Sequence, residues 1–293
     1  MSGPAPYLEY AARGHNAWWR YLLAGVVGLV IGFTPLVAIP IVLIAAQVVP
    51  VDIIKQVVSP DHPLLFFPAN GIVFASLLLG LWAAIRLIQG KRFGDLTGRW
   101  TWRRVGLGAG VWSVVLVAAT LLDLAIRPSG FKVTAGTLTP AIVAVAMLCL
   151  AVQTFAEEWV FRGWITQGLL LAFRGRPLAT SAVAGLIFGS VHIPNGWPQA
   201  ANAVVFGIAT SYIAIRQGGF AFTWGLHLVN NLFGGLVVVS QGDVFRAAPG
   251  LISQQTPSLM WWDVAVSVVA LAVVAWRAGA SPAAPLRTSA APP

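Results

Sequence analysis

The sequence predicts an all-α fold: a polytopic membrane protein of about eight transmembrane helices with both termini in the cytoplasm. Of its 293 residues, 58% are hydrophobic and only 9% are charged, whereas charged residues make up about 25% of an ordinary soluble domain. The charges lie between long apolar runs, and a run of about 20 apolar residues is long enough to cross a bilayer as a helix. Basic side chains also gather in alternate loops, as they do in membrane proteins.

Eight apolar segments follow one another along the chain. Trp18 and Trp19 precede the first, as aromatic residues do at a membrane interface, and this segment is too long for the apolar region of a cleaved signal peptide. Pro35 and Pro40 should kink it. The expected spans cover residues 21–49, 64–88, 105–126, 139–173, 178–193, 198–215, 219–240 and 259–276.

The segments between the spans predict the domain organisation and the orientation. We expect a cytoplasmic lead at 1–20, a single transmembrane domain at 21–276 with its catalytic core at 139–240, and a disordered cytoplasmic tail at 277–293, which is rich in Ala, Pro and Ser. The inner segments hold twelve basic residues: Arg13, Arg20, Lys91, Arg92, Arg99, Arg103, Arg104, Arg174, Arg176, Arg216, Arg277 and Arg287. The outer loops hold four: Lys55, Arg127, Lys132 and Arg246. Since basic residues favour the cytoplasmic side, both termini should lie there.

The net charge of +9 does not indicate a nucleic-acid partner. The basic residues are divided among loops, with no arginine-rich arm and no basic surface interleaved with aromatic residues. We therefore expect the lipid bilayer, and no nucleic acid, as a partner. Glycines four residues apart should allow helices to pack closely; they occur at Gly28/Gly32, Gly106/Gly110 and Gly185/Gly189.

Glu157-Glu158-Trp159-Val160-Phe161-Arg162 places three ionisable side chains in one of the most apolar parts of the chain. An ionised side chain at bilayer depth costs about 2.5–3.5 kcal/mol on insertion scales, which indicates a functional site. Glu158 and Arg162 have the spacing and order that favour an ion pair on a helix. Glu157 lies about 100° round the helix from Glu158, so it is the candidate for chemistry. A purely structural ion cluster is the alternative, and the surplus acid counts against it.

Two histidines in later spans accompany these acids. His192 follows Phe188 by four residues, and His227 precedes Asn230 and Asn231 by three and four, so both asparagines can share its helix face. Alone, each histidine could simply join two helices. Together with the acids, they predict a site with a general base, two imidazoles and an amide donor.

The depths of these residues agree only in part. At about 1.5 Å per residue, Glu157 and His192 lie roughly 24 and 22 Å from the inner ends of their spans, but His227 lies only about 12 Å from its own. Either the fourth span tilts or breaks, for which Gly163 and Gly168 are available, or the expected span boundaries are off by a turn.

The three motifs in this order resemble the CPBP family of intramembrane proteases. This family includes the type II CAAX prenyl endopeptidases and bacterial relatives linked to bacteriocin processing and immunity. The motifs stand here as Glu157-Glu158-Trp159-Val160-Phe161-Arg162, Phe188-Gly189-Ser190-Val191-His192 and His227-Leu228-Val229-Asn230-Asn231. None of these signature positions departs from the family pattern.

The resemblance implies a role for each of these residues. Glu157 would act as the general base that activates a water, with His192 assisting. His227 and Asn231 would orient the water or stabilise the oxyanion, and Asn230 could exchange roles with Asn231. Supporting positions would be Glu158, Arg162, Asn230 and Phe188. The family has been described both as metal-free and as metal-dependent, so the cofactor is either zinc or none; a zinc ion would take Glu157, His192 and His227 as ligands.

The function expected from the resemblance is that of an intramembrane endopeptidase in the cell membrane, most simply a bacterial inner membrane. Its substrate would be a membrane-embedded or lipid-anchored peptide, either a prenylated CAAX protein or a bacteriocin-like peptide. A proton-coupled transporter is one alternative, although no inverted repeat supports it. A catalytically silent scaffold or immunity protein on the same fold is the other, although the complete signature counts against it.

Overall fold

The fold is that of an all-α, multi-pass membrane protein, as predicted. The structure, a computed structural model, describes residues 6–134, 137–242, 244–255 and 261–280. All eight expected spans coincide with helices. They are α2 (Trp18–Ala45), α4 (Pro63–Ile88), α6 (Trp102–Ile126), α7 (Pro140–Glu158) with η3 (Trp159–Ile165) and α8 (Thr166–Ala172), α9 (Pro177–Ser190), α10 (Trp197–Gln217), α11 (Ala221–Leu232) with η5 (Phe233–Val237), and α12 (Trp261–Ala280).

Six of these segments are long and apolar enough to cross a membrane: α2, α4, α6, the continuous helix from α7 to α8, α10 and α12. The other two are shorter, because α9 has 14 residues and α11 has 12. A count of eight spans therefore stays a prediction. The helix α12 continues to Ala280, into the first residues of the predicted tail. The rest of that tail, residues 281–293, lies outside the described part of the chain.

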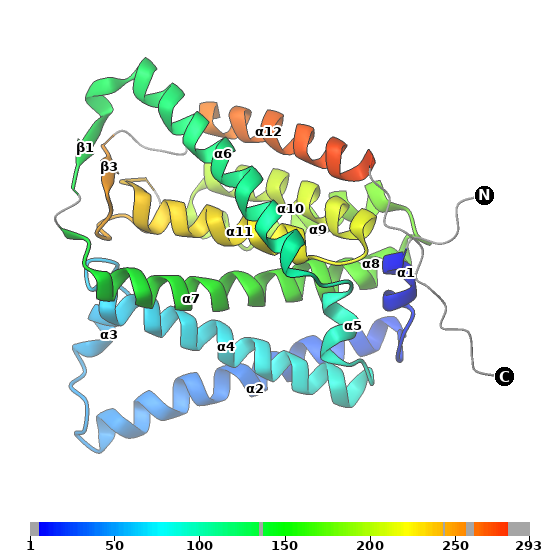
Figure 1. The fold of residues 1–293 in the computed structure, drawn as a ribbon. Coiled ribbons are helices and arrows are strands. Elements are labelled where there is room, and N and C mark those ends of the chain that lie inside the picture. The colour runs from blue at the N-terminus through cyan, green and yellow to red at the C-terminus, as the bar shows by residue number, and fades with distance from the viewer. Residues whose placement is uncertain (1–5, 135–136, 243, 256–260, 281–293) are drawn as a thin grey trace.

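Short elements occupy the predicted connections. They are α1 (Pro6–Ala11), α3 (Ile53–Val57), α5 (Phe93–Thr97), and the single 3₁₀ turns η1 (Pro128–Gly130) and η4 (Ile193–Asn195). In Figure 1, α1 and the last turns of α12 lie at the same end of the molecule. This agrees with an even number of crossings, but which end faces the cytoplasm stays a prediction.

A small sheet at the opposite end was not predicted. It contains β1 (Phe131–Val133), β2 (Val238–Ser240) and β3 (Ile252–Gln254), in the order β1-β3-β2, with β1 antiparallel and β2 parallel to β3. The seventh span was expected to remain helical to residue 240, and this was wrong. Gly234 and Gly235 weaken the helix there, and the valines that follow favour a strand.

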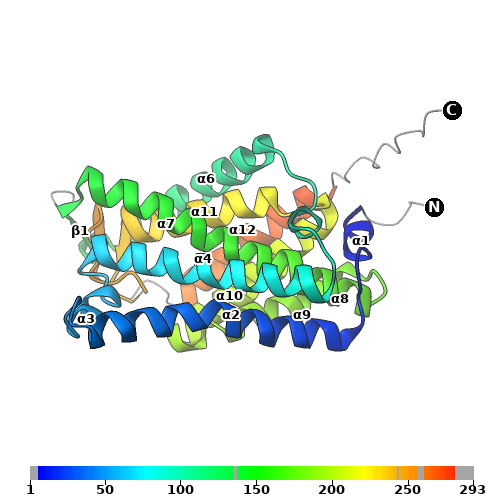
Figure 2. The same ribbon diagram turned by 90° about the horizontal axis from the view of Figure 1, so that it is seen from below.

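Five helical elements form the interior of the bundle and three helices lie on its periphery. The helix α7 packs against α4 and α11, and α9 packs against α10. Among the peripheral helices, α2 packs on α4, α6 on α11 and α12 on α10. Figures 1 and 2 show α2 and α4 side by side along one side of α7. The peripheral helices leave large apolar side chains exposed, as a lipid-facing surface requires.

Glycines let several helix pairs approach closely, although one predicted pair does not. Gly28 and Gly32 lie against α4, and Gly185 and Gly189 lie against α10. The prediction for Gly106 and Gly110 was wrong, because a Cβ on either would meet no atom within 4 Å. Gly108, between them, faces α11 instead: a Cβ there would lie 1.9 Å from the carbonyl oxygen of Phe222.

Candidate active site

The acidic motif lies where α7 changes into a π-helical segment. Glu157 and Glu158 end α7, and η3 follows at once over Trp159–Ile165. The helix changes its winding here without breaking, and Gly163 lies within the π-helical segment. Two side chains pair with backbone carbonyls of the segment: the Thr166 hydroxyl donates to Phe161 O over 2.7 Å, and the Tyr7 hydroxyl donates to Arg162 O over 2.6 Å. Such π segments are frequent at functional sites.

Glu158 is the acid that pairs with Arg162, as its spacing predicts. Its Oε1 lies 3.2 Å from Arg162 Nη1, and both side chains are fully buried. The same oxygen is 2.9 Å from His227 Nδ1, and Oε2 accepts a hydrogen bond of 2.7 Å from the Thr223 hydroxyl. Glu158 therefore has three partners and no solvent exposure.

Arg162 is held by an aromatic ring and a hydroxyl as well as by Glu158. Its guanidinium lies 4.2 Å from the centre of the Phe188 ring, an attractive arrangement for a cation. Its Nε and Nη2 donate to the Thr210 hydroxyl over 2.9 and 2.6 Å. Phe188 and Thr210 thus join α9 and α10 to η3.

Glu157 has a different environment from that of Glu158. Its Oε1 accepts a hydrogen bond of 3.0 Å from Gln153 Nε2, and its Oε2 lies 3.7 Å from His227 Nε2. The second distance exceeds that of a direct hydrogen bond. One oxygen of Glu157 is therefore held by an uncharged amide, and the other faces an imidazole nitrogen without binding it directly.

His227 lies between the two acids. An ionised carboxylate can only accept a hydrogen bond, so the bond to Glu158 assigns the proton of the neutral imidazole to Nδ1. The Nε2 lone pair then faces Glu157. The Phe206 ring centre lies 5.1 Å from that of His227 and limits the position of the imidazole.

His192 lies next to Phe188 rather than in contact with the acids. It is half-buried just beyond the end of α9, and its Nδ1 is 2.7 Å from Phe188 O. Because a carbonyl only accepts, Nδ1 carries the proton of the neutral ring and Nε2 keeps its lone pair. The Phe188 ring separates the two imidazoles, with its centre 4.6 Å from that of His192 and 6.1 Å from that of His227.

The two asparagines have different partners. Asn230 Oδ1 accepts a hydrogen bond of 3.0 Å from Trp112 Nε1, and its Nδ2 donates to Asn231 Oδ1 over 3.3 Å. Asn230 therefore joins α11 to α6. Asn231 is half-buried, and its Nδ2 has no protein acceptor within the described chain. Asn231 is thus the better placed of the two to donate to a substrate.

The proposed zinc ligands do not form a ready metal site. Within the residues that the structure describes, no three His, Cys, Asp or Glu side chains are placed so that they could hold one metal ion. Glu157 and His227 are neighbours, but His192 contacts Phe188 through its Nδ1 and its ring. The ligand set Glu157, His192 and His227 does not fit zinc in this arrangement, and zinc stays a prediction.

The mismatch in depth between His227 and the acids has a simple cause. The Phe155 and Phe220 ring centres are 5.7 Å apart, so α11 begins level with the last turn of α7. The long helix continues beyond that level through η3 and α8 to Ala172. The end of α8 at Ala172 and the start of α11 at Ala221 therefore lie at different levels, whereas the predicted depths require them to be level.

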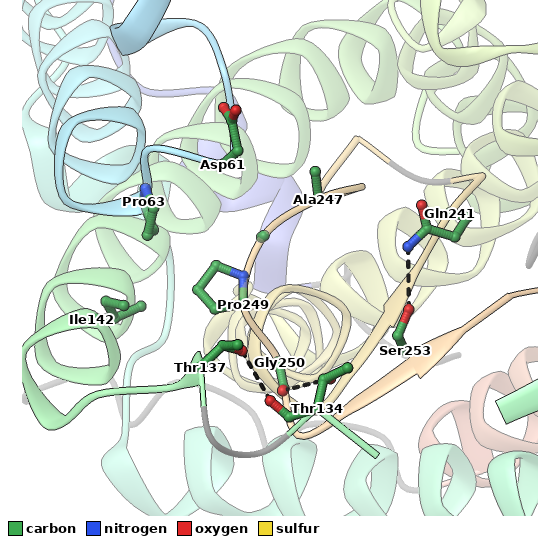
Figure 3. Close-up of a pocket in the computed structure, with 11 residues that line it drawn as sticks. Asp61, Pro63, Thr134, Thr137, Ile142, Gln241, Ala247, Pro249, Gly250 and Ser253 are labelled. Atoms are coloured by element: carbon green, nitrogen blue, oxygen red, sulfur yellow. Dashed lines mark hydrogen bonds between the residues drawn. The ribbon is translucent and has the colours of Figure 1, made fainter. Parts of the chain in front are cut away.

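A cavity of about 500 Å³ lies far from this site, at the end of the molecule that carries the sheet (Figure 3). Ile142 contributes to its wall from α7, and the fifteen residues from there to Glu157 span about 22 Å of helix. Its polar side chains are largely paired with one another or with the backbone: Gln241 donates to Ser253, and Thr134 donates to Gly250 O. The cavity contributes nothing to the acidic site.

Several residues of the site were not predicted from the sequence. Thr210 and Thr223 contact Arg162 and Glu158 directly, and Tyr7 reaches η3 from the first helix. Asn70, on α4, donates a 2.6 Å hydrogen bond to Gln153. Of these residues, Asn70 could have been found from the sequence. It is a polar amide within an apolar span, and the same criterion identified the two histidines.

Comparison with known proteins supports the motif assignment. The family model described as "Type II CAAX prenyl endopeptidase Rce1-like" matches residues 138–233. The predicted family resemblance is confirmed for this segment. The Rce1-like segment contains both acids, both histidines and both asparagines, whereas Tyr7 and Asn70 lie outside it. The chain is also similar to "Uncharacterized protein YyaK" of Bacillus subtilis (strain 168), with 26% identity over 284 residues, 90% of this chain and 93% of that protein. No solved structure matches.

Proposed function

We propose that this protein is an intramembrane endopeptidase that hydrolyses a peptide bond of a membrane-associated substrate with a water activated by Glu157. The observation that carries the proposal is the contrast between the adjacent acids. Glu158 is fully buried and has three partners, whereas Glu157 keeps one oxygen directed at His227 Nε2. The similarity of the surrounding segment to a family named for endopeptidases supports the assignment.

In the proposed reaction, a water lies between Glu157 Oε2 and His227 Nε2. Two atoms 3.7 Å apart can both contact one water at about 2.8 Å. Glu157 takes a proton as the water oxygen attacks the carbonyl carbon of the scissile bond. The resulting oxyanion accepts a hydrogen bond from Asn231 Nδ2, and a donor of this kind contributes about 3 kcal/mol to transition-state stabilisation. The proton then passes to the leaving amine as the carbon–nitrogen bond breaks, with His192 assisting.

Glu158 and Arg162 position the catalytic groups in this scheme. The ion pair holds His227 by its Nδ1, so that Nε2 faces Glu157. Phe188 supports both Arg162 and His192. The substrate is a membrane-embedded or lipid-anchored peptide, and a prenylated CAAX protein is the specific candidate that the family description suggests. The cell membrane, in bacteria the inner membrane, is the proposed location.

The test compares peptide termini in membrane fractions of cells that express the wild type, Glu157→Gln or Asp61→Asn at equal levels. Asp61 is an exposed acid on the wall of the cavity at the sheet end of the molecule (Figure 3), so its variant should act as the wild type. New termini that require Glu157 would support the proposal and would identify the substrate. Identical profiles for all three folded proteins would contradict it and favour a silent scaffold or a proton transporter.

A chelator series on the purified protein tests the zinc prediction separately. Loss of cleavage that zinc restores would mean that His192 moves towards Glu157 and His227 when the ion binds.

A further inference from the structure

A one-way chain of hydrogen bonds reaches Glu157 from α4. Asn70 Nδ2 donates to Gln153 Oε1 over 2.6 Å, and Gln153 Nε2 donates to Glu157 Oε1 over 3.0 Å. The ionised carboxylate fixes this direction, because it can only accept. Gln153 must therefore present its nitrogen to Glu157 and its oxygen to Asn70, and Asn70 must donate.

Close packing of α4 against α7 explains how the Asn70 side chain reaches Gln153. Gly71 follows Asn70 and lies against Cys149 on α7, where a Cβ on the glycine would be 3.1 Å from the cysteine side chain. The helices α4 and α7 are thus close at this level, and Gln153 is one turn beyond Cys149 and one turn before Glu157. Asn70 and Gln153 are both half-buried and lie within apolar helices, where uncompensated amides are unfavourable.

The effect of the chain is to hold one oxygen of Glu157. With Oε1 bound to Gln153, the carboxylate plane is fixed and Oε2 is directed at His227 Nε2. Without Gln153, the carboxylate could rotate about its terminal torsion, which is broad for glutamate. Neither amide can take up or release a proton near neutral pH, so a positioning role is the one they can fill.

We propose that Asn70 and Gln153 form a positioning pair that orients Glu157 for catalysis, with Asn70 acting through Gln153. The inference rests on the proposed function, and it extends the site beyond the Rce1-like segment to α4. It also gives a reason for a polar residue in the second predicted span.

The test uses full-length protein in lipid nanodiscs and a quenched fluorescent peptide that carries the cleavage site found by the comparison of termini. The variants are Gln153→Met, Asn70→Leu and the double variant. Each substitution keeps the side-chain size and removes the hydrogen bonds. Ser76→Ala is the control, because Ser76 lies on α4 as Asn70 does but donates to Gly32 O of α2 over 2.8 Å, on the side away from the acidic site.

For Gln153→Met we expect kcat to fall by roughly tenfold to a hundredfold, because misplacement of a catalytic group has effects of this size, while KM changes by less than about twofold. Asn70→Leu should lower kcat by less. The double variant should be no slower than Gln153→Met alone, since Asn70 has no route to Glu157 except through Gln153. Ser76→Ala should keep the wild-type kcat.

Independent, additive losses from the two substitutions would overturn the inference. A rise in KM with unchanged kcat would also overturn it, because it would indicate contact with the substrate rather than orientation of Glu157. If the wild type produces no new termini, the proposed function fails first and the positioning role fails with it. An active wild type with fully active pair variants overturns the positioning role alone.

Discussion

Glu157 and Glu158 are adjacent in sequence, yet they have quite different surroundings. About 100° of helix rotation separates them, and this directs Glu158 towards Arg162 and Thr223 and Glu157 towards Gln153. The i to i+4 ion pair was predictable because it depends only on local helix geometry. The family resemblance implied Asn231 as the donor and left Asn230 as the alternative. The structural argument for Asn231 depends on Trp112, which comes from another helix and binds Asn230.

Glu157→Gln and Glu158→Gln should therefore have different effects on stability. Glu158→Gln removes the counterion of a fully buried guanidinium, and breaking such a pair costs about 3–5 kcal/mol. Glu157→Gln removes no direct ion pair with Arg162 and should leave the midpoint of thermal unfolding close to that of the wild type. Unfolding curves in detergent measure both. Equal destabilisation by the two substitutions would contradict the separate roles.

Alanine substitutions of Asn231 and Asn230 should likewise differ, the first acting mainly on kcat and the second mainly on stability. Asn231→Ala should lower kcat by roughly a hundredfold or more, the usual effect of losing an oxyanion donor. Asn230→Ala leaves the Trp112 indole N–H without its acceptor and should cost about 1–2 kcal/mol of stability with a smaller loss of kcat. The fluorescent-peptide assay and thermal unfolding distinguish them. A greater loss of kcat in Asn230→Ala would reverse the assignment.

At the scale of the elements, the positions of the helices were predictable from the sequence. The side that each helix turns towards its neighbours was only partly predictable. Apolar runs located a helix at each of the eight predicted spans, but a run of 20 apolar residues contains little information about which side faces a neighbour. The error at Gly106 and Gly110 is of this kind: the true contact is at Gly108. The sheet was missed because its three-residue strands pair segments distant in the sequence.

Alanine at Gly108 and at Gly110 should therefore act in opposite directions. Gly108→Ala places a methyl group against a carbonyl of α11, and such overpacking costs about 1–3 kcal/mol. Gly110→Ala meets no neighbouring atom and should stabilise α6 by up to about 1 kcal/mol. The measurement is the free energy of unfolding of each variant in the same detergent. Destabilisation by both would place Gly110 in a contact that the structure does not have.

At the scale of the whole molecule, α1 and the residues just after it are held against the segment between α4 and α5 and against α5 itself by polar contacts. Lys91 Nζ donates to Ala11 O over 2.7 Å, and Arg13 pairs with Asp95 at 2.8 Å. Burial lowers the pKa of Lys91 to about 8. Burial alone would raise the pKa of Asp95, but hydrogen bonds from Arg13 and from the Arg92 backbone outweigh it and hold that pKa below its ordinary value.

The lysine predicts a rise of stability with pH. Between pH 8 and the unfolded pKa of 10.5, the unfolded chain binds the proton that the folded chain has released, so the free energy of unfolding increases, by at most about 3 kcal/mol. The pH range in which Lys91 alone sets the trend ends near pH 10. Burial raises the pKa of Tyr7 above its ordinary value of 10.0, so above that pH the unfolded chain loses the tyrosine proton first and this contribution lowers the stability. Thermal unfolding from pH 7.5 to 9.5 should show the rise, and Lys91→Met should flatten it. A wild-type curve as flat as that of the variant would contradict the prediction.

The bond from Tyr7 to the carbonyl of Arg162 joins residues 155 positions apart, and this has a consequence for the order of assembly. At typical synthesis rates of about 5–20 residues per second, the ribosome needs roughly 8–30 s to make the intervening chain. During that time the first helix exists without its binding site, while α2 and α4 are already available to the membrane. Its docking must therefore be a late event in biogenesis, and the N-terminal residues, although made first, are among the last to reach their final place.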